Sequence, residues 1–207
     1  MRLIETDADL AEGAAHLSSV CPVWAGVLPE LTLPLRRRSD GFAAILDAVI
    51  GQQISVAAAG AIMARLKEAG LTDAAAIRAA GPDALRECGV SRPKIRYLTG
   101  IVENEPDWLA LRSASDDEVA ATLVALPGIG QWTAEIYLAF ALGRSDAFPA
   151  GDLALQESAR LLYGLETRPG PKQLLKMAEP WQPWRAIAAR GLWAYYRVAK
   201  GREGVRS

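Results

Sequence analysis

Apolar residues recur at helical spacing along almost the whole chain, and no segment shows the apolar/polar alternation of a half-buried strand. From Phe42 to Ile50 the apolar positions follow i, i+3, i+4, i+7 and i+8, which predicts an amphipathic helix with Ser39 or Asp40 as its N-cap. Similar patterns predict an all-α protein of about ten short helices. The other helices are expected at residues 10–17, 55–70, 73–80, 82–88, 91–102, 116–125, 131–142, 153–164, 172–178 and 183–200.

Capping and breaking residues set several of these boundaries. Ser55 and Thr72 are expected to cap the helices that follow them, and Gly81 with Pro82 is expected to break a helical run. Ser115 and Glu118 have the spacing of a capping box, in which each side chain accepts a bond from the other residue's backbone amide.

Composition limits the chemistry that is available. The chain has 207 residues, 51% of them apolar, which suits one large domain or two small lobes. Cys21 and Cys88 are the only cysteines and His16 the only histidine, which argues against cysteine-ligated clusters, zinc fingers and histidine-based triads. No apolar run is long enough to span a membrane, and the acidic start has no signal-peptide core. We therefore expect a soluble intracellular protein.

The net charge of −1 gives no general attraction for nucleic acid, but the basic residues are clustered. The alternative interpretation is that these residues lie on solvated helix faces, and only the fold can join them into one patch. The clusters are Arg36–Arg38, then Arg92, Lys94 and Arg96, then the stretch 185–207 with Arg185, Arg190, Arg197, Lys200, Arg202 and Arg206.

The segment Leu126-Pro127-Gly128-Ile129-Gly130 joins two predicted helices. Glycines permit positive φ and close approach of another backbone, and Pro127 stiffens the turn. The amides near Gly128 and Gly130 precede a helix, where free N–H groups favour a phosphate. Ile129 is expected to be buried against the two helices or to hold the loop down. Taken alone, the motif favours a tight interhelical turn that has no ligand.

A single acid, Asp152, follows Pro149-Ala150-Gly151 and precedes the next helix. An aspartate there is ordinarily an N-cap, and the helix dipole favours its ionised form. A carboxylate in such a place can also stabilise an oxocarbenium-like transition state and orient water. Asp146 is the rival acid, and we interpret it as a residue that braces the loop.

Together these features resemble the helix–hairpin–helix superfamily of DNA glycosylases, and most of all its alkylation-repair branch, the 3-methyladenine DNA glycosylase II type. The resemblance rests on LPGIGQWTAEIYLAFALG, the loop RSDAFPAGD and the earlier GQQIS, and extends from about Phe42 to Tyr196. It implies one domain over 1–207, a compact two-lobed helical fold with its active-site cleft between the lobes. One lobe would span about 41–145 with the hairpin at 116–142, and the other about 1–40 plus 146–207. The N-terminal β-rich domain of larger bacterial members is expected to be absent.

The resemblance assigns roles to residues of this chain. Asp152 takes the catalytic position. Trp132 stands where bifunctional lyases of the superfamily carry a nucleophilic lysine, so no Schiff base is expected there and the abasic product should remain uncut. The hairpin residues expected to bind DNA are Gly128, Ile129, Gly130 and Thr133.

A flipped base needs a pocket, and the resemblance suggests Trp132 and Trp193 as stacking partners, with Ile136 and Tyr137 completing a wall. Core packing is the alternative for all four, and it is the role we favour for Tyr137, Trp181 and Trp184. In GQQIS, Gln53 is the candidate wedge that fills the gap in the base stack, with Gln52 beside it. Ser55 would hold a phosphate through the amides of its helix. The alternative is that both glutamines are simply solvated.

The implied activity is base excision repair by a monofunctional DNA glycosylase, which would release 3-methyladenine or 7-methylguanine from duplex DNA containing damaged bases. We expect no cofactor, although a monovalent cation among the hairpin carbonyls would agree with the resemblance. A monomer in the cytoplasm, at the nucleoid if bacterial, with no membrane partner, is expected. Two alternatives stay open: a glycosylase for another damaged base, such as a deaminated purine or uracil, and a non-catalytic DNA-binding module.

Overall fold

The computed structural model describes residues 2–201, without the side chain of Lys200. Within this range the chain forms twelve α-helices and short helical turns, and its β-structure is limited to an isolated bridge between Leu3 and Arg144. The all-α class is therefore confirmed. No helix in this part of the chain has both the length and the apolar character needed to cross a membrane. Arg202 and Arg206, counted above in the third basic cluster, lie outside the described residues.

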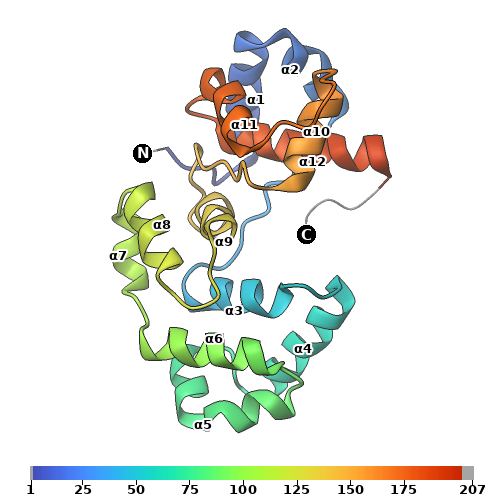
Figure 1. Ribbon diagram of the computed structural model, residues 1–207. Helices are drawn as coiled ribbons and strands as arrows, with labels where there is room; N and C mark the ends of the chain where they lie inside the picture. Colours follow the sequence, from blue (N-terminus) through green and yellow to red (C-terminus); the bar gives the residue numbers. More distant parts are fainter. Residues whose placement is uncertain (1, 202–207) are drawn as a thin grey trace. The chain divides into compact units, whose positions relative to one another are not determined.

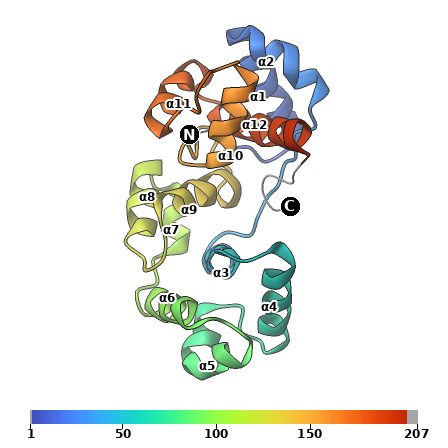
Figure 2. The same cartoon turned by 45° about the vertical axis from the view of Figure 1, so that its right-hand side comes forward.

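The chain divides into two compact units. Unit 1 consists of residues 1–37 and 138–207, and unit 2 of residues 38–137. In unit 1 helices from the first and last parts of the chain pack together, because the blue helices α1 and α2 lie beside α12 and the orange α10 and α11 in both ribbon views (Figures 1 and 2). Its elements are α1 (Asp7–Val20), α2 (Pro22–Val27), η1 (Leu28–Glu30), α10 (Leu153–Leu162), α11 (Pro171–Met177), η3 (Glu179–Trp181) and α12 (Arg185–Lys200).

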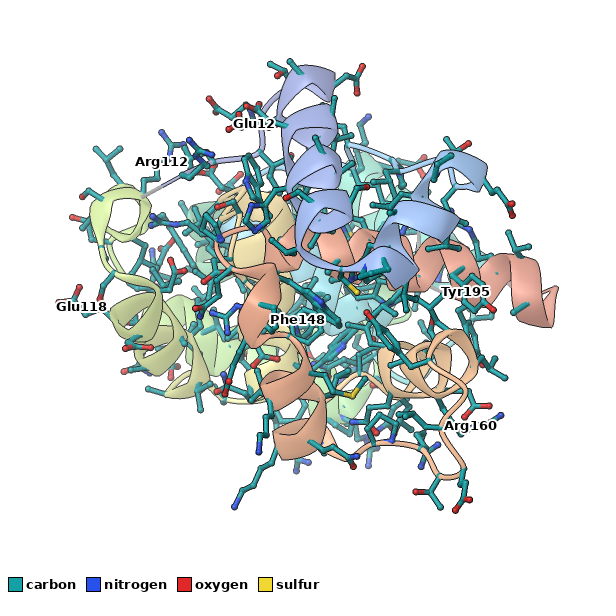
Figure 3. The ribbon with its side chains drawn as sticks, turned by 90° about the horizontal axis from the view of Figure 1, so that it is seen from above. Glu12, Arg112, Glu118, Phe148, Arg160 and Tyr195 are labelled. Atoms are coloured by element: carbon teal, nitrogen blue, oxygen red, sulfur yellow. The ribbon has the colours of Figure 1, made fainter. Side chains whose placement is uncertain are left out.

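The core of unit 1 is built around Trp181, which is 2% exposed. Trp24 and Phe148 meet its ring edge-on, with centroids 5.5 and 5.8 Å away, and Tyr163 stacks on it at 6.2 Å. Figure 3 shows Phe148 among the packed side chains, whereas Glu12 and Arg160 extend from the outer faces of their helices. Trp184 is buried to the same extent as Trp181, so the core role that we favoured for these two tryptophans is confirmed.

Unit 2 contains the remaining helices. A pair of long helices, α5 and α6, packs side by side in both ribbon views. The elements are α3 (Phe42–Gly51), α4 (Val56–Glu68), α5 (Ala74–Glu87), α6 (Arg92–Glu103), α7 (Trp108–Ser113), α8 (Asp116–Val124) and α9 (Gln131–Ile136). A π-helical turn, η2 (Tyr137–Ala141), continues α9 and begins at the last residue of unit 2. The helix predicted over 131–142 is therefore helical but changes its hydrogen-bond register after Ile136.

Most of the predicted caps are confirmed. The Ser55 hydroxyl accepts from the amide of Ala58 at 3.2 Å, and the Ser115–Glu118 capping box is complete. Gly81, at φ 76°, breaks α5 as expected. Two assignments were wrong: Asp73, not Thr72, caps α5 through the amide of Ala76, and neither Ser39 nor Asp40 caps α3.

Gly41 is the N-cap of α3 and carries no side chain for this purpose. The Asp40 carboxylate instead pairs with the guanidinium of Arg112 on α7. Arg112, 72 positions away, thus binds the Asp40 carboxylate, which the local sequence pattern predicted to cap α3. The short helices α2 and α7 were not predicted, because six residues each give too little periodicity to recognise.

Candidate active site

The hairpin between α8 and α9 is anchored by apolar side chains and exposes its glycines. Leu126 is 6% exposed and Ile129 4%, and the amide of Ile129 donates to the carbonyl of Leu126 at 3.2 Å. The burial expected for Ile129 is confirmed, so only its backbone is available for the DNA contact predicted for it. Gly128 and Gly130 are exposed. The turn therefore presents main chain, rather than side chains, to the surface of unit 2.

Gly128 is required by both torsion and space. Its φ is +77°, and a Cβ atom there would lie 2.5 Å from Cδ2 of Tyr97 on α6. Gly130 is the N-cap of α9 and provides no side-chain hydrogen bond to the helix amides. Main-chain N–H groups at such a turn favour an anion, which agrees with the predicted phosphate contact.

Helix α9 separates one exposed aromatic residue from three buried side chains. Trp132 is 43% exposed, whereas Thr133, Ile136 and Tyr137 are 7, 6 and 4% exposed. The Tyr137 hydroxyl accepts from the amide of Gly41 at 3.0 Å, and its ring packs 6.2 Å from Trp108. Burial raises the pKa of this phenol. The core packing that we favoured for Tyr137 is confirmed, and its pocket role stays a prediction, as do those of Ile136 and Thr133.

The two glutamines in the loop between α3 and α4 differ in their contacts, exposure and backbone conformation. The side-chain amide of Gln52 donates to the carbonyl of Gly128 at 2.9 Å, so Gln52 is fixed to the hairpin. Gln53 is exposed and has φ +56°, a left-handed conformation that is costly for a residue with a Cβ atom. We call residues 52–55 the wedge loop. Its geometry presents Gln53, and it distinguishes Gln53 from Gln52 as the candidate wedge.

Asp152 lies in unit 1, at the end of a loop with fixed geometry. It is 9% exposed, and its Oδ1 accepts from the amides of Ala154 and Leu155 at 2.8 and 3.0 Å, so the predicted N-cap is confirmed. The side chain of Gln156 donates to the carbonyl of Ala150 at 2.9 Å, and the amide of Asp152 to that of Pro149 at 2.9 Å. The carboxylate is therefore held at the N-terminus of α10 by its own helix and by the loop before it.

Asp146 braces the same loop, as expected. Its two carboxylate oxygens accept from Nε and an Nη of Arg185 at 2.8 and 2.7 Å, and the neighbouring Ser145 carbonyl accepts from the amide of Ala186. These bonds attach the loop to the first turn of α12. Asp146 is thus committed to an ion pair, which agrees with the bracing role expected for it.

Trp193 is 1% exposed and packs on Phe140, with ring centroids 5.6 Å apart. The backbone beside it is fixed by Ser158, whose hydroxyl donates to the carbonyl of Leu192 at 2.7 Å. Among the described residues, no group accepts the buried indole N–H of Trp193. This burial is what the core-packing alternative expects of Trp193, and its pocket role stays a prediction.

Three polar residues that position these parts gave no recognisable signal in the sequence. Gln156 fixes the loop before Asp152, as described above. Lys94 is 8% exposed, and its Nζ donates to the carbonyl of Ile50 at 2.7 Å. Arg190 is 2% exposed and donates to the carbonyls of Ala186 and Ala139, with its guanidinium 4.6 Å from the Phe140 ring centroid. Burial lowers the pKa of Arg190 to about 10.

The basic clusters are largely committed to internal contacts. Lys94 and Arg190 are buried, and Arg185 binds Asp146. Arg37 pairs with Glu5 at 3.0 Å and Arg38 with Asp47 at 3.7 Å. Arg92 and Arg96 are exposed at the start of α6. Several of these basic side chains therefore make contacts within the protein, whereas the sequence suggested either a DNA-binding patch or solvated helix faces.

The predicted site residues fall into two groups, one in each unit. Within the described residues, no group of three or more His, Cys, Asp and Glu side chains is placed to hold a metal ion. Unit 1 contains Asp152 and Trp193. Unit 2 contains the hairpin residues Gly128, Ile129 and Gly130, the α9 residues Trp132, Thr133 and Ile136, the first η2 residue Tyr137, and the wedge-loop residues Gln52, Gln53 and Ser55.

Comparison with known proteins links the chain to one family. The model of the HhH-GPD superfamily of base excision DNA repair proteins matches residues 46–183. The chain is 30% identical to DNA-3-methyladenine glycosylase 1 of Schizosaccharomyces pombe, over 98% of this chain and 94% of that protein. The solved DNA-3-methyladenine glycosidase of Bacillus halodurans superposes with a TM-score of 0.81 at 29% identity, over 99% and 97% of the two chains. Mag1 of S. pombe, solved in complex with abasic DNA, gives 0.77 at 28% identity, over 94% of this chain and all of that chain.

Proposed function

Because the chain belongs to the HhH-GPD superfamily of base excision DNA repair proteins, we propose that it is a monofunctional DNA glycosylase. It removes alkylated purines of the 3-methyladenine and 7-methylguanine type from duplex DNA. Two relatives that match this chain over nearly their full length are 3-methyladenine glycosylases by name, which supports this substrate class. We propose further that it acts as a monomer in the compartment that holds the chromosome, and that it needs no cofactor.

Asp152 is the catalytic residue in this proposal. An alkylated purine carries a positive charge, so it can leave with both electrons of its bond to C1′ and needs no general acid. The Asp152 carboxylate stabilises the positive charge that develops on the sugar and accepts the proton of the water that attacks C1′. At the N-terminus of α10, two backbone amides bind Oδ1 and fix the orientation of the carboxylate.

Trp132 makes the reaction hydrolytic in this proposal. A lyase needs an amine that attacks C1′ and forms a Schiff base, and an indole ring has none. The exposed ring of Trp132 offers its electron-rich face to a cationic base instead. The buried Trp193, backed by Phe140, is the second aromatic surface for the base.

The remaining residues bind the duplex and hold it open. Exposed main chain at Gly128 and Gly130 contacts the phosphates, and the amides after Ser55 do the same from α4. Gln53 enters the base stack when the damaged nucleotide leaves it, and its amide can bond to the opposite base. A monovalent cation bound by hairpin carbonyls would strengthen the phosphate contact.

The observation that carries the proposal is the combination of one rigidly held carboxylate, Asp152, with a tryptophan at position 132. The experiment is incubation with methylated duplex DNA, followed by chromatography of the released bases and gel analysis of the strands. Release of 3-methyladenine or 7-methylguanine with intact strands is the expected result. Strand cleavage would contradict the hydrolytic mechanism. Release of hypoxanthine or uracil alone would indicate the other damaged bases, and salt-sensitive binding without base release would indicate a non-catalytic module.

A further inference from the structure

The wedge loop and the hairpin, the two DNA-binding segments proposed in unit 2, are joined directly by one side chain. Gln52 and Gly128 are 76 positions apart, yet the Gln52 amide donates to the Gly128 carbonyl at 2.9 Å. Gln52 has extended backbone and is half-buried, whereas Gln53 next to it is exposed and left-handed. The bond therefore fixes the residue immediately before the wedge to the turn that is to hold the phosphate.

Helix α6 contacts the end of α3, just before the wedge loop, and also the hairpin turn. The α6 residues that make these contacts are spaced three apart. Lys94 donates from its buried Nζ to the carbonyl of Ile50, in the last turn of α3, where a cation is favoured by the helix dipole. Tyr97, three residues on, lies against Gly128, where a Cβ atom would be 2.5 Å from the Tyr97 ring. Gly100, three residues further, lies against Pro127, and a Cβ atom on Gly100 would be 2.8 Å from Pro127 Cγ.

Positions i, i+3 and i+6 lie along one face of a helix, so these three contacts form a single stripe. The rest of α6 is fixed in the core of unit 2, since Leu98 and Ile101 are fully buried. The stripe thus has a rigid base. It begins where the wedge loop begins, at the end of α3, and finishes under the first residues of the hairpin turn.

We infer that α6 and Gln52 together set the spacing between the wedge and the phosphate-binding turn. Helix α6 acts through Lys94, Tyr97 and Gly100, and Gln52 bridges the two segments. Insertion of Gln53 into the base stack and binding of the DNA backbone by the turn then occur as one event. This inference rests on the proposed function, because it assumes that both segments meet DNA. Gln52 is then a positioning residue for flipping and contacts no base, in contrast to the direct DNA contact expected from the sequence.

The test compares two DNA substrates that differ in the free energy needed to flip the damaged nucleotide out of the duplex. In one duplex an alkylated purine is paired, and in the other the same lesion faces an abasic site and has no partner to lose. Gln52→Glu keeps the size of the side chain and removes the amide donor. Gln173→Glu, the same change at an exposed position of α11 in unit 1, is the matched control.

Gln52→Glu is expected to slow single-turnover base release from the paired duplex by at least about 3- to 10-fold, because it removes one hydrogen bond and sets a carboxylate against the Gly128 carbonyl. On the lesion that faces an abasic site the change should stay below about twofold. Gln173→Glu should alter neither rate. Equal losses on both substrates, or no loss on the paired one, would overturn the inference, because a merely structural defect acts on both.

A second readout does not require base release. 2-Aminopurine placed at the target position brightens when it leaves the stack, so emission at saturating protein reports flipping. Gln52→Glu and Gly100→Ala should both give a smaller rise than the wild type, with unfolding midpoints confirming that each variant is folded. An unchanged rise, or no rise with the wild type, would overturn the inference. A wild type that flips the base but releases none would refute the proposed function and leave the spacing inference standing.

Discussion

Asp146 and Arg185 form a two-point ion pair that ties the loop ending at Asp152 to the first residue of α12. Both guanidinium–carboxylate bonds are shorter than 3 Å, and the two side chains are 29% and 22% exposed. The pair is therefore partly shielded from solvent, where such bonds are stronger than on an open surface. Because the loop carries the proposed catalytic carboxylate, the pair should matter for activity as well as for stability.

Arg185→Lys should test this link. Lysine retains the charge but cannot make two parallel bonds to Asp146. We expect a loss of about 1 kcal/mol in the free energy of unfolding, measured by urea denaturation, together with slower base release.

The matched control is Arg160→Lys, because Arg160 makes a similar two-point pair with Glu157 on the outer face of α10. This control should lose no more stability than Arg185→Lys and should keep its rate of base release. An equal fall in rate for the two variants would show that the Asp146 pair has no special connection with catalysis.

Trp132→Ala should weaken excision of cationic bases. Removal of the ring face should lower kcat/KM for 7-methylguanine release by about tenfold, the upper part of the range for a cation–π contact. Trp132→Phe keeps an aromatic face and should recover most of the rate. Equal losses for alanine and phenylalanine would contradict the role of an aromatic face at position 132. Borohydride should trap no covalent complex of the wild type with DNA.

The capping box at the start of the hairpin should give the protein an acid-sensitive element. Bonds from the Ser115 hydroxyl and then from its amide lower the pKa of the Glu118 carboxyl below its ordinary value of 4.5. A carboxyl with a lowered pKa stabilises the folded state above its unfolded pKa, and this contribution is lost as the pH falls through the lower, folded-state value.

Glu118→Gln should remove this contribution. The free energy of unfolding of the variant should change less than that of the wild type between pH 6 and pH 3, values chosen to bracket the ordinary carboxyl pKa of about 4.5. Urea denaturation at several pH values gives the comparison, and Glu87→Gln on α5 serves as a surface control. Parallel pH curves for wild type and Glu118→Gln would exclude a role for the cap.

Local sequence was sufficient where the physics is local. The caps formed by Ser55, Ser115 and Asp152 need only the amides two or three residues ahead, so their spacing predicts them. Apolar periodicity likewise predicts the longer helices. The local sequence pattern was insufficient at Asp40, because the distant Arg112 binds the carboxylate that was expected to cap α3.

Several contacts that could not be predicted join distant parts of the chain. Lys94 and Arg190 look like surface charges, and nothing nearby in sequence shows that they will reach the carbonyls of Ile50 and Ala139. The bond from Gln52 to Gly128 is of the same kind. These side chains bind backbone carbonyls. Every residue has a backbone carbonyl, so the sequence does not show which one will accept the bond.

Asp152 performs the chemistry in the proposed mechanism, and the substitution Asp152→Asn tests this role. Asparagine caps a helix about as well as aspartate, so the variant should fold and bind DNA containing an abasic-site analogue as the wild type does. Asp73→Asn makes the same change at the N-cap of α5 and is the matched control. We predict that Asp152→Asn releases 3-methyladenine from methylated duplex DNA at least about a hundredfold more slowly than Asp73→Asn. Equal release by the two variants would contradict the account.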